Sequence, residues 1–132
     1  LAASIGLIQL KKLDRMNARR SEIIRMYLNG ISELKTIKPL LPFKPEDYVY
    51  QMFGIRAEKR DELMIFLKSK GIATGCHYTP LTRQPLFSPY TSECPIAEKL
   101  SESFITLPLH ADLENKEVHY IIEHLIKFEQ DI

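Results

Sequence analysis

The sequence predicts an α+β domain, in which a small three-stranded, mainly antiparallel sheet is covered by helices and a long helix opens the chain. Three observations predict this class. Apolar residues recur at steps of three and four along residues 1–32, which is the period of a helix. Three later segments are short and rich in β-branched or aromatic residues, as strands are. Helical patterns separate and follow these segments, so helices are expected to cover mainly one face of the sheet.

Residues 1–32 are predicted to form one helix that ends near Gly30. The positions that set its period are Ala3, Leu7, Leu10, Leu13, Ile24, Tyr27, Leu28 and Ile31. A helix of this length would extend roughly 45 Å, whereas a domain of 132 residues has a radius of gyration near 14 Å, by an estimate of about 2.2·N^0.38 Å. Part of it is therefore expected to pack on protein outside this chain. The alternative is that its apolar start, Leu1 to Ile8, is buried within this same domain.

The middle of the chain begins with a predicted loop at 36–47, because three prolines there fix the backbone and remove donors. A strand is predicted at 48–56 and a compact helix at 58–70, with Gly71 as its C-terminal stop. A second strand is predicted at 72–78. The buried face of the helix is expected to be Leu63, Phe66 and Leu67.

The last part of the chain is predicted as a proline-rich loop at 79–94, a helix at 95–104, a strand at 105–109 and a helix at 115–130. Pro95 suits the first position of its helix, where no backbone donor is needed. The N-cap of the last helix is left open between Asp112 and Asn115. The residues expected to face inward are Ala97, Leu100 and Phe104 on the first helix and Val118, Ile121, Ile122, Leu125 and Ile126 on the second.

Composition excludes several classes of protein. Eighteen basic and seventeen acidic side chains leave a formal charge of +1, so no broad field for nucleic acid or an anionic membrane is expected. The sequence contains no apolar run of about 18 residues, so no transmembrane helix is predicted. Cys76 and Cys94 are expected to be two free thiols in a reducing cytoplasm, with a disulfide as the alternative. A zinc site made of these two cysteines with His77 and His110 is not expected, since the spacing matches no standard pattern.

The stretch from Gly71 to Leu81 carries the candidate site. His77 and Tyr78 fall where an apolar strand runs out, just before the loop fixed by Pro80, and polar side chains at such a place are well placed to meet a ligand. The alternative is that they simply finish the strand. Arg83 in the same loop suits a phosphate or a carboxylate, or else it is an ordinary surface arginine.

No motif of an independent catalyst accompanies these residues, and the catalytic set is predicted to be empty. His110 follows Leu109 and is read as a surface histidine, with a position in a loop at the sheet edge as the alternative. His119 and His124 are five positions apart on the last predicted helix, so they point in different directions and form no metal pair. Both are expected to be solvated.

Several motifs, in order along nearly the whole chain, resemble the small domain of the DegT/DnrJ/StrS family of sugar aminotransferases. The opening of the chain resembles the segment that begins that domain, and the later blocks resemble its HYxPLHxQP loop and its P-x-A-E and LPLH sequences. The matching residues are Ala2 to Leu13, Arg19, Arg20, Tyr27, Arg60 to Leu63, Leu67, Gly71 to Thr74, His77 to Leu81, Gln84, Pro85, Pro95, Ala97, Glu98 and Leu107 to His110.

The resemblance implies the aspartate-aminotransferase fold, which is fold type I of the enzymes that use pyridoxal 5'-phosphate (PLP). It implies a homodimer that transfers an amino group, usually from glutamate, to a nucleotide-linked keto sugar in the biosynthesis of polysaccharides or other glycans. Residues 1–132 would be the single C-terminal small domain, with a linking helix at 1–32 and an α/β body at 48–132. The large domain and its Schiff-base lysine would be absent, so this chain alone is expected to bind no cofactor and to be inactive. The enzyme is expected in the cytoplasm, without nucleic-acid or membrane partners.

By the same resemblance, His77 and Tyr78 are carried over as substrate-binding candidates, and Arg83 is a weaker one. Thr82 stands where the family motif has its second histidine, which puts that position's role in doubt. Glu114 replaces the serine or threonine that usually caps the last helix. An alternative of a different class is a free-standing, non-catalytic module for ligand binding or interaction, which keeps the fold.

Overall fold

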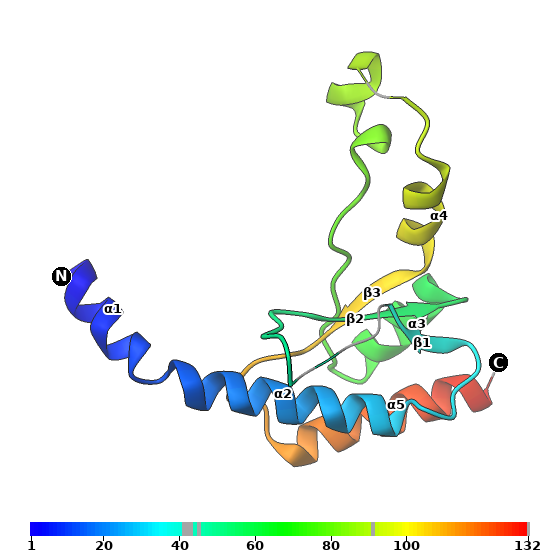
Figure 1. The fold of residues 1–132 in the computed structure, drawn as a ribbon. Helices are drawn as coiled ribbons and strands as arrows, with labels where there is room; N and C mark the ends of the chain where they lie inside the picture. Colours follow the sequence, from blue (N-terminus) through cyan, green and yellow to red (C-terminus); the bar gives the residue numbers. More distant parts are fainter. Residues whose placement is uncertain (41–43, 45, 91, 132) are drawn as a thin grey trace.

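A computed structural model describes residues 1–40, 44, 46–90 and 92–131. Helices lie along one side of a small sheet, one helix extends from this body at the N-terminus, and an arm rises from the other side of the sheet (Figure 1). The arm is made of residues 76–90 and 92–103. The elements in chain order are α1 (Ala2–Leu10), α2 (Leu13–Gly30), β1 (Ile37–Pro39), β2 (Phe53–Ala57), α3 (Arg60–Ser69), the 3-10 helices η1 (Leu81–Arg83) and η2 (Pro85–Tyr90), α4 (Pro95–Ser103), β3 (Phe104–Leu107) and α5 (Asn115–Gln130).

The sheet confirms the predicted α+β class, with three antiparallel strands in the order β1-β2-β3. Its register pairs Ile37 with Ala57 and Ile55 with Ile105. Along β2, Phe53, Ile55 and Ala57 are buried and point to one face, because side chains alternate along a strand. Helices α2 and α5 pack against each other and cover that face (Figure 1).

One predicted strand and one predicted loop are wrong. The segment 72–78 forms no strand; only Gly75 pairs with Thr106 in an isolated bridge, because the chain then leaves the body as the arm. The strand β1 lies instead inside the predicted loop 36–47, where Pro39 is tolerated because β1 is an edge strand. Residues 41–43 and 45 of that loop lie outside the described part of the chain. The strand predicted at 48–56 begins later, at Phe53.

The core is one cluster between the sheet and its helices. At its centre Tyr27 of α2 is fully buried, stacks on Phe53 at 4.9 Å between ring centroids, and donates a hydrogen bond to the Pro108 carbonyl at 2.9 Å. Burial raises the pKa of the Tyr27 hydroxyl well above its usual value. The other fully enclosed side chains are Ile23, Ile24, Ile31, Ile37, Ile55, Leu63, Leu67, Ile105, Val118 and Leu125.

The last helix was predicted with the bounds that α5 has. Its N-cap is neither of the two residues expected. Glu114 fills the position and forms a capping box with Glu117, whose carboxylate accepts the Glu114 backbone N–H at 2.8 Å. The predicted buried face is confirmed except that Ile126 is only half-buried.

The expectation of a solvated His124 is wrong. This side chain is 7% exposed, and its ring packs beside Tyr120 and Phe66, with centroids 4.2 and 6.0 Å away. The position is tolerated because Nδ1 lies 2.8 Å from the Tyr120 carbonyl oxygen, which satisfies a polar atom that burial would otherwise leave unpaired. His119, by contrast, is exposed as expected.

The single helix predicted over 1–32 is two helices, separated by a turn at Lys11 and Lys12. The Lys12 N–H bonds to the Gln9 carbonyl, three residues back instead of four, which tightens the chain there. The sequence predicted one helix because neither glycine nor proline marks this break and the apolar period continues across it. No residue of α1 is buried, and Leu1 is 99% exposed. The alternative in which this apolar end is buried in the same domain is therefore wrong.

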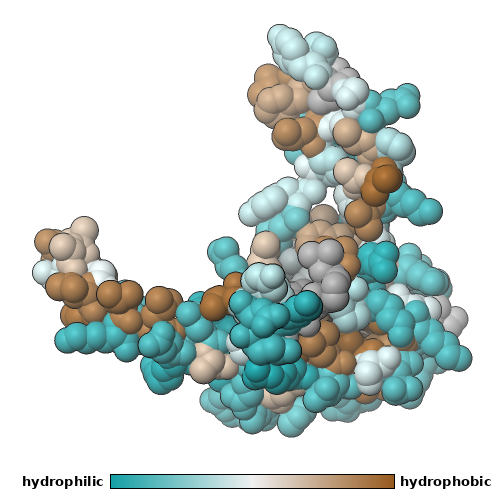
Figure 2. Space-filling model, in the orientation of Figure 1, coloured by the Kyte–Doolittle hydropathy of each residue, from teal (hydrophilic) through white to brown (hydrophobic). Residues whose placement is uncertain are grey.

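The arm also differs from expectation. Helix α4 begins at Pro95 as predicted, but Ala97 and Leu100 are exposed and no residue of this helix is buried. Of the three residues that were expected to face inward here, only Phe104 is half-buried. It follows directly after the arm, and its ring lies against the backbone of Gly54. Apolar side chains gather on the arm and on α1 (Figure 2). The large exposed ones are Leu1, Ile5, Leu7, Ile8 and Leu10 on α1, and Tyr78, Leu81, Leu86, Phe87, Tyr90, Ile96 and Leu100 on the arm.

Helix α3 places Leu63 and Leu67 in the core and leaves Phe66 half-buried. Gly71 follows it with φ of 74°, a conformation that favours glycine and confirms the predicted stop. Among the described helices none is both long and apolar enough to cross a membrane.

Glu129, near the end of α5, fastens the segment that leads into β1. Its carboxylate accepts hydrogen bonds from the Lys35 and Thr36 backbone N–H groups and from the Thr36 hydroxyl, the last at 2.6 Å. Burial alone would raise the pKa of the Glu129 carboxyl, but the hydrogen bonds from Thr36, Lys35 and Ile37 outweigh it and hold this pKa below its usual range. The carboxylate therefore joins the end of the last helix to the edge of the sheet.

Replacing Glu129 with glutamine is expected to lower the free energy of unfolding by about 1–2 kcal/mol near neutral pH. Because the folded-state pKa is lowered, the carboxylate's contribution is complete above its unfolded pKa of about 4.3 and is lost as the pH falls through the folded value. Urea denaturation of both proteins should show their difference shrinking at acid pH. The control E123Q removes an exposed partner of Lys127 and should change stability little. A difference that stays constant on acidification would contradict the assignment.

Candidate functional site

His77 lies at the base of the arm, directly after the residue that pairs with the sheet. The Gly75 N–H donates to the Thr106 carbonyl at 3.1 Å, and the Thr106 N–H donates back to the Gly75 carbonyl at 2.8 Å. The His77 Nδ1 atom is 3.0 Å from the Thr106 hydroxyl oxygen, and that hydroxyl is 3.1 Å from the Gly75 carbonyl oxygen. When the single hydroxyl proton is donated to Gly75, Nδ1 of His77 carries its own proton and donates it to Thr106. Nε2 is then an acceptor.

Gly75 permits this arrangement because it has no side chain. A Cβ atom there would overlap the His77 ring and would lie 3.0 Å from the Thr106 hydroxyl oxygen. Thr106 itself is 5% exposed, so the group that orients His77 is held inside the sheet. The histidine is half-buried and its position is set by a rigid strand.

Tyr78 follows His77 across a cis peptide bond and is 78% exposed. The two rings meet edge to face, with centroids 5.1 Å apart and planes at 82°. The Tyr78 hydroxyl has no hydrogen-bond partner in the part of the chain that the structure describes. The sequence therefore identified two side chains that the structure brings together, one oriented and one open to a ligand.

Arg83 is in η1 and makes a different contact. Its Nη2 atom lies 2.6 Å from a Glu102 carboxylate oxygen, which ties the rising part of the arm to α4. The hydrogen bond from Arg83 lowers the pKa of the Glu102 carboxyl, and the same bond raises the pKa of Arg83. Next to it, the hydroxyl of Thr82 is buried and finds no hydrogen-bond partner among the described residues. Arg83 is thus a paired surface residue that would have to share or leave Glu102 to bind a ligand.

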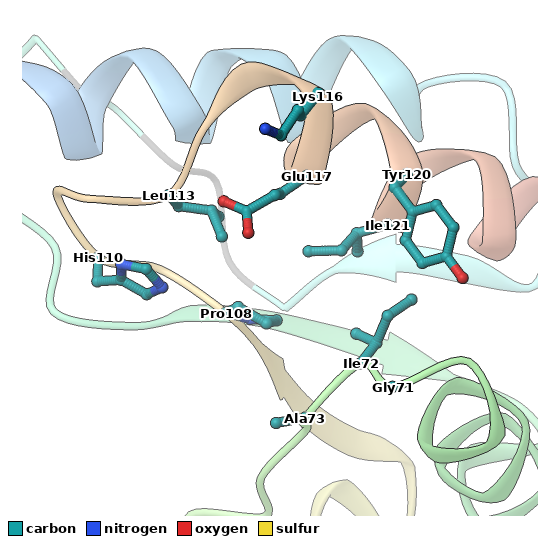
Figure 3. Close-up of a pocket in the computed structure, with 10 residues that line it drawn as sticks. All are labelled: Gly71, Ile72, Ala73, Pro108, His110, Leu113, Lys116, Glu117, Tyr120 and Ile121. Atoms are coloured by element: carbon teal, nitrogen blue, oxygen red, sulfur yellow. The ribbon is translucent and has the colours of Figure 1, made fainter.

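A further hollow lies in a different place. It has a volume of about 520 Å³ and lies between the start of α5 and the segment after α3 (Figure 3). Three of its polar side chains are already partnered: Lys116 is 2.7 Å from Glu114, Glu117 accepts the Glu114 backbone N–H, and the Tyr120 hydroxyl donates to the Lys70 carbonyl at 3.3 Å. His110 stands exposed at its edge, which fits both readings of that residue. None of His77, Tyr78 and Arg83 lines this hollow. Its partnered groups Lys116 and Glu117 contact Glu114 at the N-terminus of α5.

Sequence reasoning missed Thr106 and Arg60. Nothing in a short run of β-branched residues marks Thr106 as the partner of a histidine 29 positions earlier. Arg60 donates to the Cys76 sulfur at 3.2 Å and supports the other side of the same turn. Cys76 and Cys94 are free thiols, and no three metal-ligating side chains gather among the described residues.

Solved structures share this architecture. The chain superposes on DesV of S. venezuelae, in complex with a ketimine intermediate, with a TM-score of 0.91, 29% identity, and coverage of 98% of this chain and 36% of that one. A candidate sugar aminotransferase from Streptococcus pneumoniae in its PMP form gives 0.88 at 30% identity, with 98% and 34% covered. PseC of Helicobacter pylori, at 24% identity and a TM-score of 0.87, supports the fold alone. The fold is that of the C-terminal part of fold-type I aminotransferases.

The sequence comparisons agree with this class. The model of the DegT/DnrJ/EryC1/StrS aminotransferase family matches residues 1–126, and the chain belongs to that family. A pleiotropic regulatory protein of Geobacillus stearothermophilus is 31% identical over 134 residues, which cover 97% of this chain and 36% of that protein. The chain therefore spans about a third of the length of the relatives it matches.

Proposed function

We propose that residues 1–132 are the C-terminal small domain of a PLP-dependent sugar aminotransferase. The enzyme would transfer an amino group from an amino acid, expected to be glutamate, to a nucleotide-linked keto sugar in the biosynthesis of polysaccharides or other glycans. The family match over nearly the whole chain carries this proposal. The oriented His77 and the open Tyr78 supply it with a place where a polar substrate can bind.

The residues of this chain do not by themselves fit the cofactor. Every one of its lysines lies in the described part of the chain and is exposed, whereas a lysine that holds a carbonyl cofactor needs an enclosed pocket. The large domain of the enzyme, preceding this one, would supply that lysine. PLP, when bound there, supplies the electron sink for the chemistry. The present chain would bind and orient the substrate.

The roles at the site follow from the free polar atoms. His77, held through Nδ1 by Thr106, presents Nε2 as an acceptor to a sugar hydroxyl. The Tyr78 hydroxyl offers one more donor beside it. Arg83 is a third candidate, whose fork of donors suits a phosphate once it is shared with Glu102.

The exposed apolar surface supports an assembly larger than this chain. Helix α1 consists mostly of apolar residues, all of them exposed, and the arm carries further large apolar side chains (Figure 2); such surfaces mark protein–protein contacts. We assign them to the large domain and to the second copy of a homodimer. The two free thiols agree with a cytoplasmic enzyme. The non-catalytic module remains the alternative, since the complete small-domain fold would serve it equally.

The test uses the complete protein, including the segment that precedes Leu1. With glutamate and a nucleotide-linked keto sugar, it is expected to form the amino sugar and to show the absorbance of bound pyridoxal phosphate. Tyr78→Phe is expected to lower kcat/KM by roughly tenfold, and His77→Ala by tenfold or more. Each variant loses a hydrogen bond to the substrate. The control His119→Ala removes an exposed histidine on α5 and should leave kcat/KM unchanged.

Each outcome bears on one part of the proposal. A complete protein that binds no pyridoxal phosphate and transfers no amino group would favour the non-catalytic module. An active protein in which neither variant differs from the control would show that the substrate binds elsewhere.

A further inference from the structure

The face of the sheet opposite the core carries a second set of polar side chains. Because Phe53, Ile55 and Ala57 point to the helices, Gly54 and Arg56 of β2 point the other way. The register places Lys38 beside Arg56 on one side, and Phe104 beside Arg56 on the other. Thr106, two residues along β3 from Phe104, shares this face and holds His77. Thr106, which holds the candidate site, and Arg56 therefore belong to the same face of the sheet, on which Arg56 is exposed.

Three cations gather at one end of this face. Lys35, Lys38 and Arg56 line a depression of about 260 Å³, and all three are exposed. Glu58 is the one carboxylate in its lining, so the depression has an excess of positive charge. None of the three cations has an ion-pair partner within the described residues, although seven other ion pairs form there. The described part of the chain therefore leaves a net positive charge at this depression.

The pairing of Lys38 with Arg56 is unfavourable in the absence of an anion. Like charges directly opposite each other on neighbouring strands repel and destabilise the pair. A lysine on the edge strand β1 also guards against pairing with other sheets, which accounts for Lys38 alone. It does not account for Arg56, which is on the central strand. An anion held between the two side chains would turn this repulsion into attraction.

The size and donors of the depression indicate the kind of anion. Its volume is below the roughly 300–1,000 Å³ of sites that enclose whole small molecules, so it suits a compact group. The hydroxyls in the lining are already used: Thr36 donates to Glu129 and Ser103 donates to the Leu100 carbonyl. Binding would therefore rest on the ammonium groups and on the fork of the Arg56 guanidinium, which matches phosphate oxygens.

We propose that Lys35, Lys38 and Arg56 form a subsite for a diphosphate group, which holds the diphosphate of the nucleotide-linked substrate while its sugar lies at His77 and Tyr78. This rests on the proposed function. One strand spacing and a two-residue step along β3 separate Arg56 from Thr106, or roughly 8 Å between Cα atoms. The Arg56 side chain is long enough to cover much of this distance, and His77 is bonded to Thr106, so one extended substrate can contact both places.

The test measures binding of inorganic pyrophosphate to the complete protein by calorimetry at low ionic strength. Arg56→Gln is expected to weaken binding at least tenfold and Lys38→Gln severalfold. The control Lys68→Gln removes the same charge from an exposed position on α3 and should leave binding unchanged. Equal weakening in all three variants would mean that pyrophosphate responds only to net charge, and it would overturn the subsite. So would the absence of measurable binding, or unchanged binding in Arg56→Gln.

A second measurement separates this subsite from the proposed function. In the active enzyme, Arg56→Gln is expected to raise KM for the nucleotide-linked sugar at least tenfold with kcat nearly unchanged, because the diphosphate takes no part in the chemical step. Turnover with an unchanged KM would overturn the subsite and leave the function standing. Binding of pyrophosphate that depends on Arg56, in a protein that transfers no amino group, would support the subsite and overturn the function.

Discussion

Replacing Tyr27 with alanine is expected to lower the free energy of unfolding by about 3–5 kcal/mol, since it removes a fully buried aromatic side chain from the centre of the core. The ring stacks on Phe53, and its hydroxyl satisfies the Pro108 carbonyl just before the loop to α5. The loss includes both the cavity and an unpaired carbonyl. Urea denaturation followed by circular dichroism measures it.

Two further variants separate these causes. Tyr27→Phe keeps the ring and removes the hydroxyl, so it should cost only about 1 kcal/mol. Tyr48→Phe changes a tyrosine that is 62% exposed and should be neutral. Because the folded-state pKa of Tyr27 is raised, its contribution is complete below the unfolded pKa of about 10 and is lost as the pH rises beyond it. An equal loss in Tyr27→Phe and Tyr27→Ala would show that the packing of the ring contributes little.

Gly75→Ala is expected to displace His77 and to lower the free energy of unfolding by about 1–3 kcal/mol through overpacking. The added methyl group would overlap the imidazole and crowd the Thr106 hydroxyl, so the His77–Thr106 hydrogen bond cannot survive unchanged. The His77 ring signals in NMR spectra should shift. In an active complete enzyme, kcat/KM should fall at least as far as in His77→Ala.

The matched control is Gly6→Ala in α1, where a Cβ atom would meet nothing within 4 Å. It should be neutral or slightly stabilising, because alanine favours a helix over glycine by up to about 1 kcal/mol. If Gly75→Ala left the His77 signals unmoved, the close approach at the base of the arm would not hold in solution.

The final helix and the helix after β2 were predictable because one amphipathic pattern decides them. In α5, apolar residues recur at the helical period over sixteen residues, and they meet the sheet as that period requires. The segment 72–78 misled because its composition is that of a strand, whereas its pairing depends on where the chain goes next. After Gly75 it leaves the sheet, so a single bridge is all that forms.

The candidate site was predictable in part for a similar reason. Local sequence places His77 and Tyr78 before a proline-fixed loop, and the structure brings their rings together. The residue that orients His77 comes from a strand far along the chain, and Arg56 and Lys38 meet only through the register of β1 and β2. Such contacts depend on strand pairing, which no local pattern encodes.

Gly75 and Thr106 clamp the two ends of the arm together at its base, through paired backbone hydrogen bonds, and Arg83 bridges to Glu102 a little higher. The rest of the arm is therefore attached to the domain through a base that these contacts close. A change in the length of the arm beyond this ion pair is expected to leave His77 in place. The base of the arm therefore isolates the candidate site from changes at the tip.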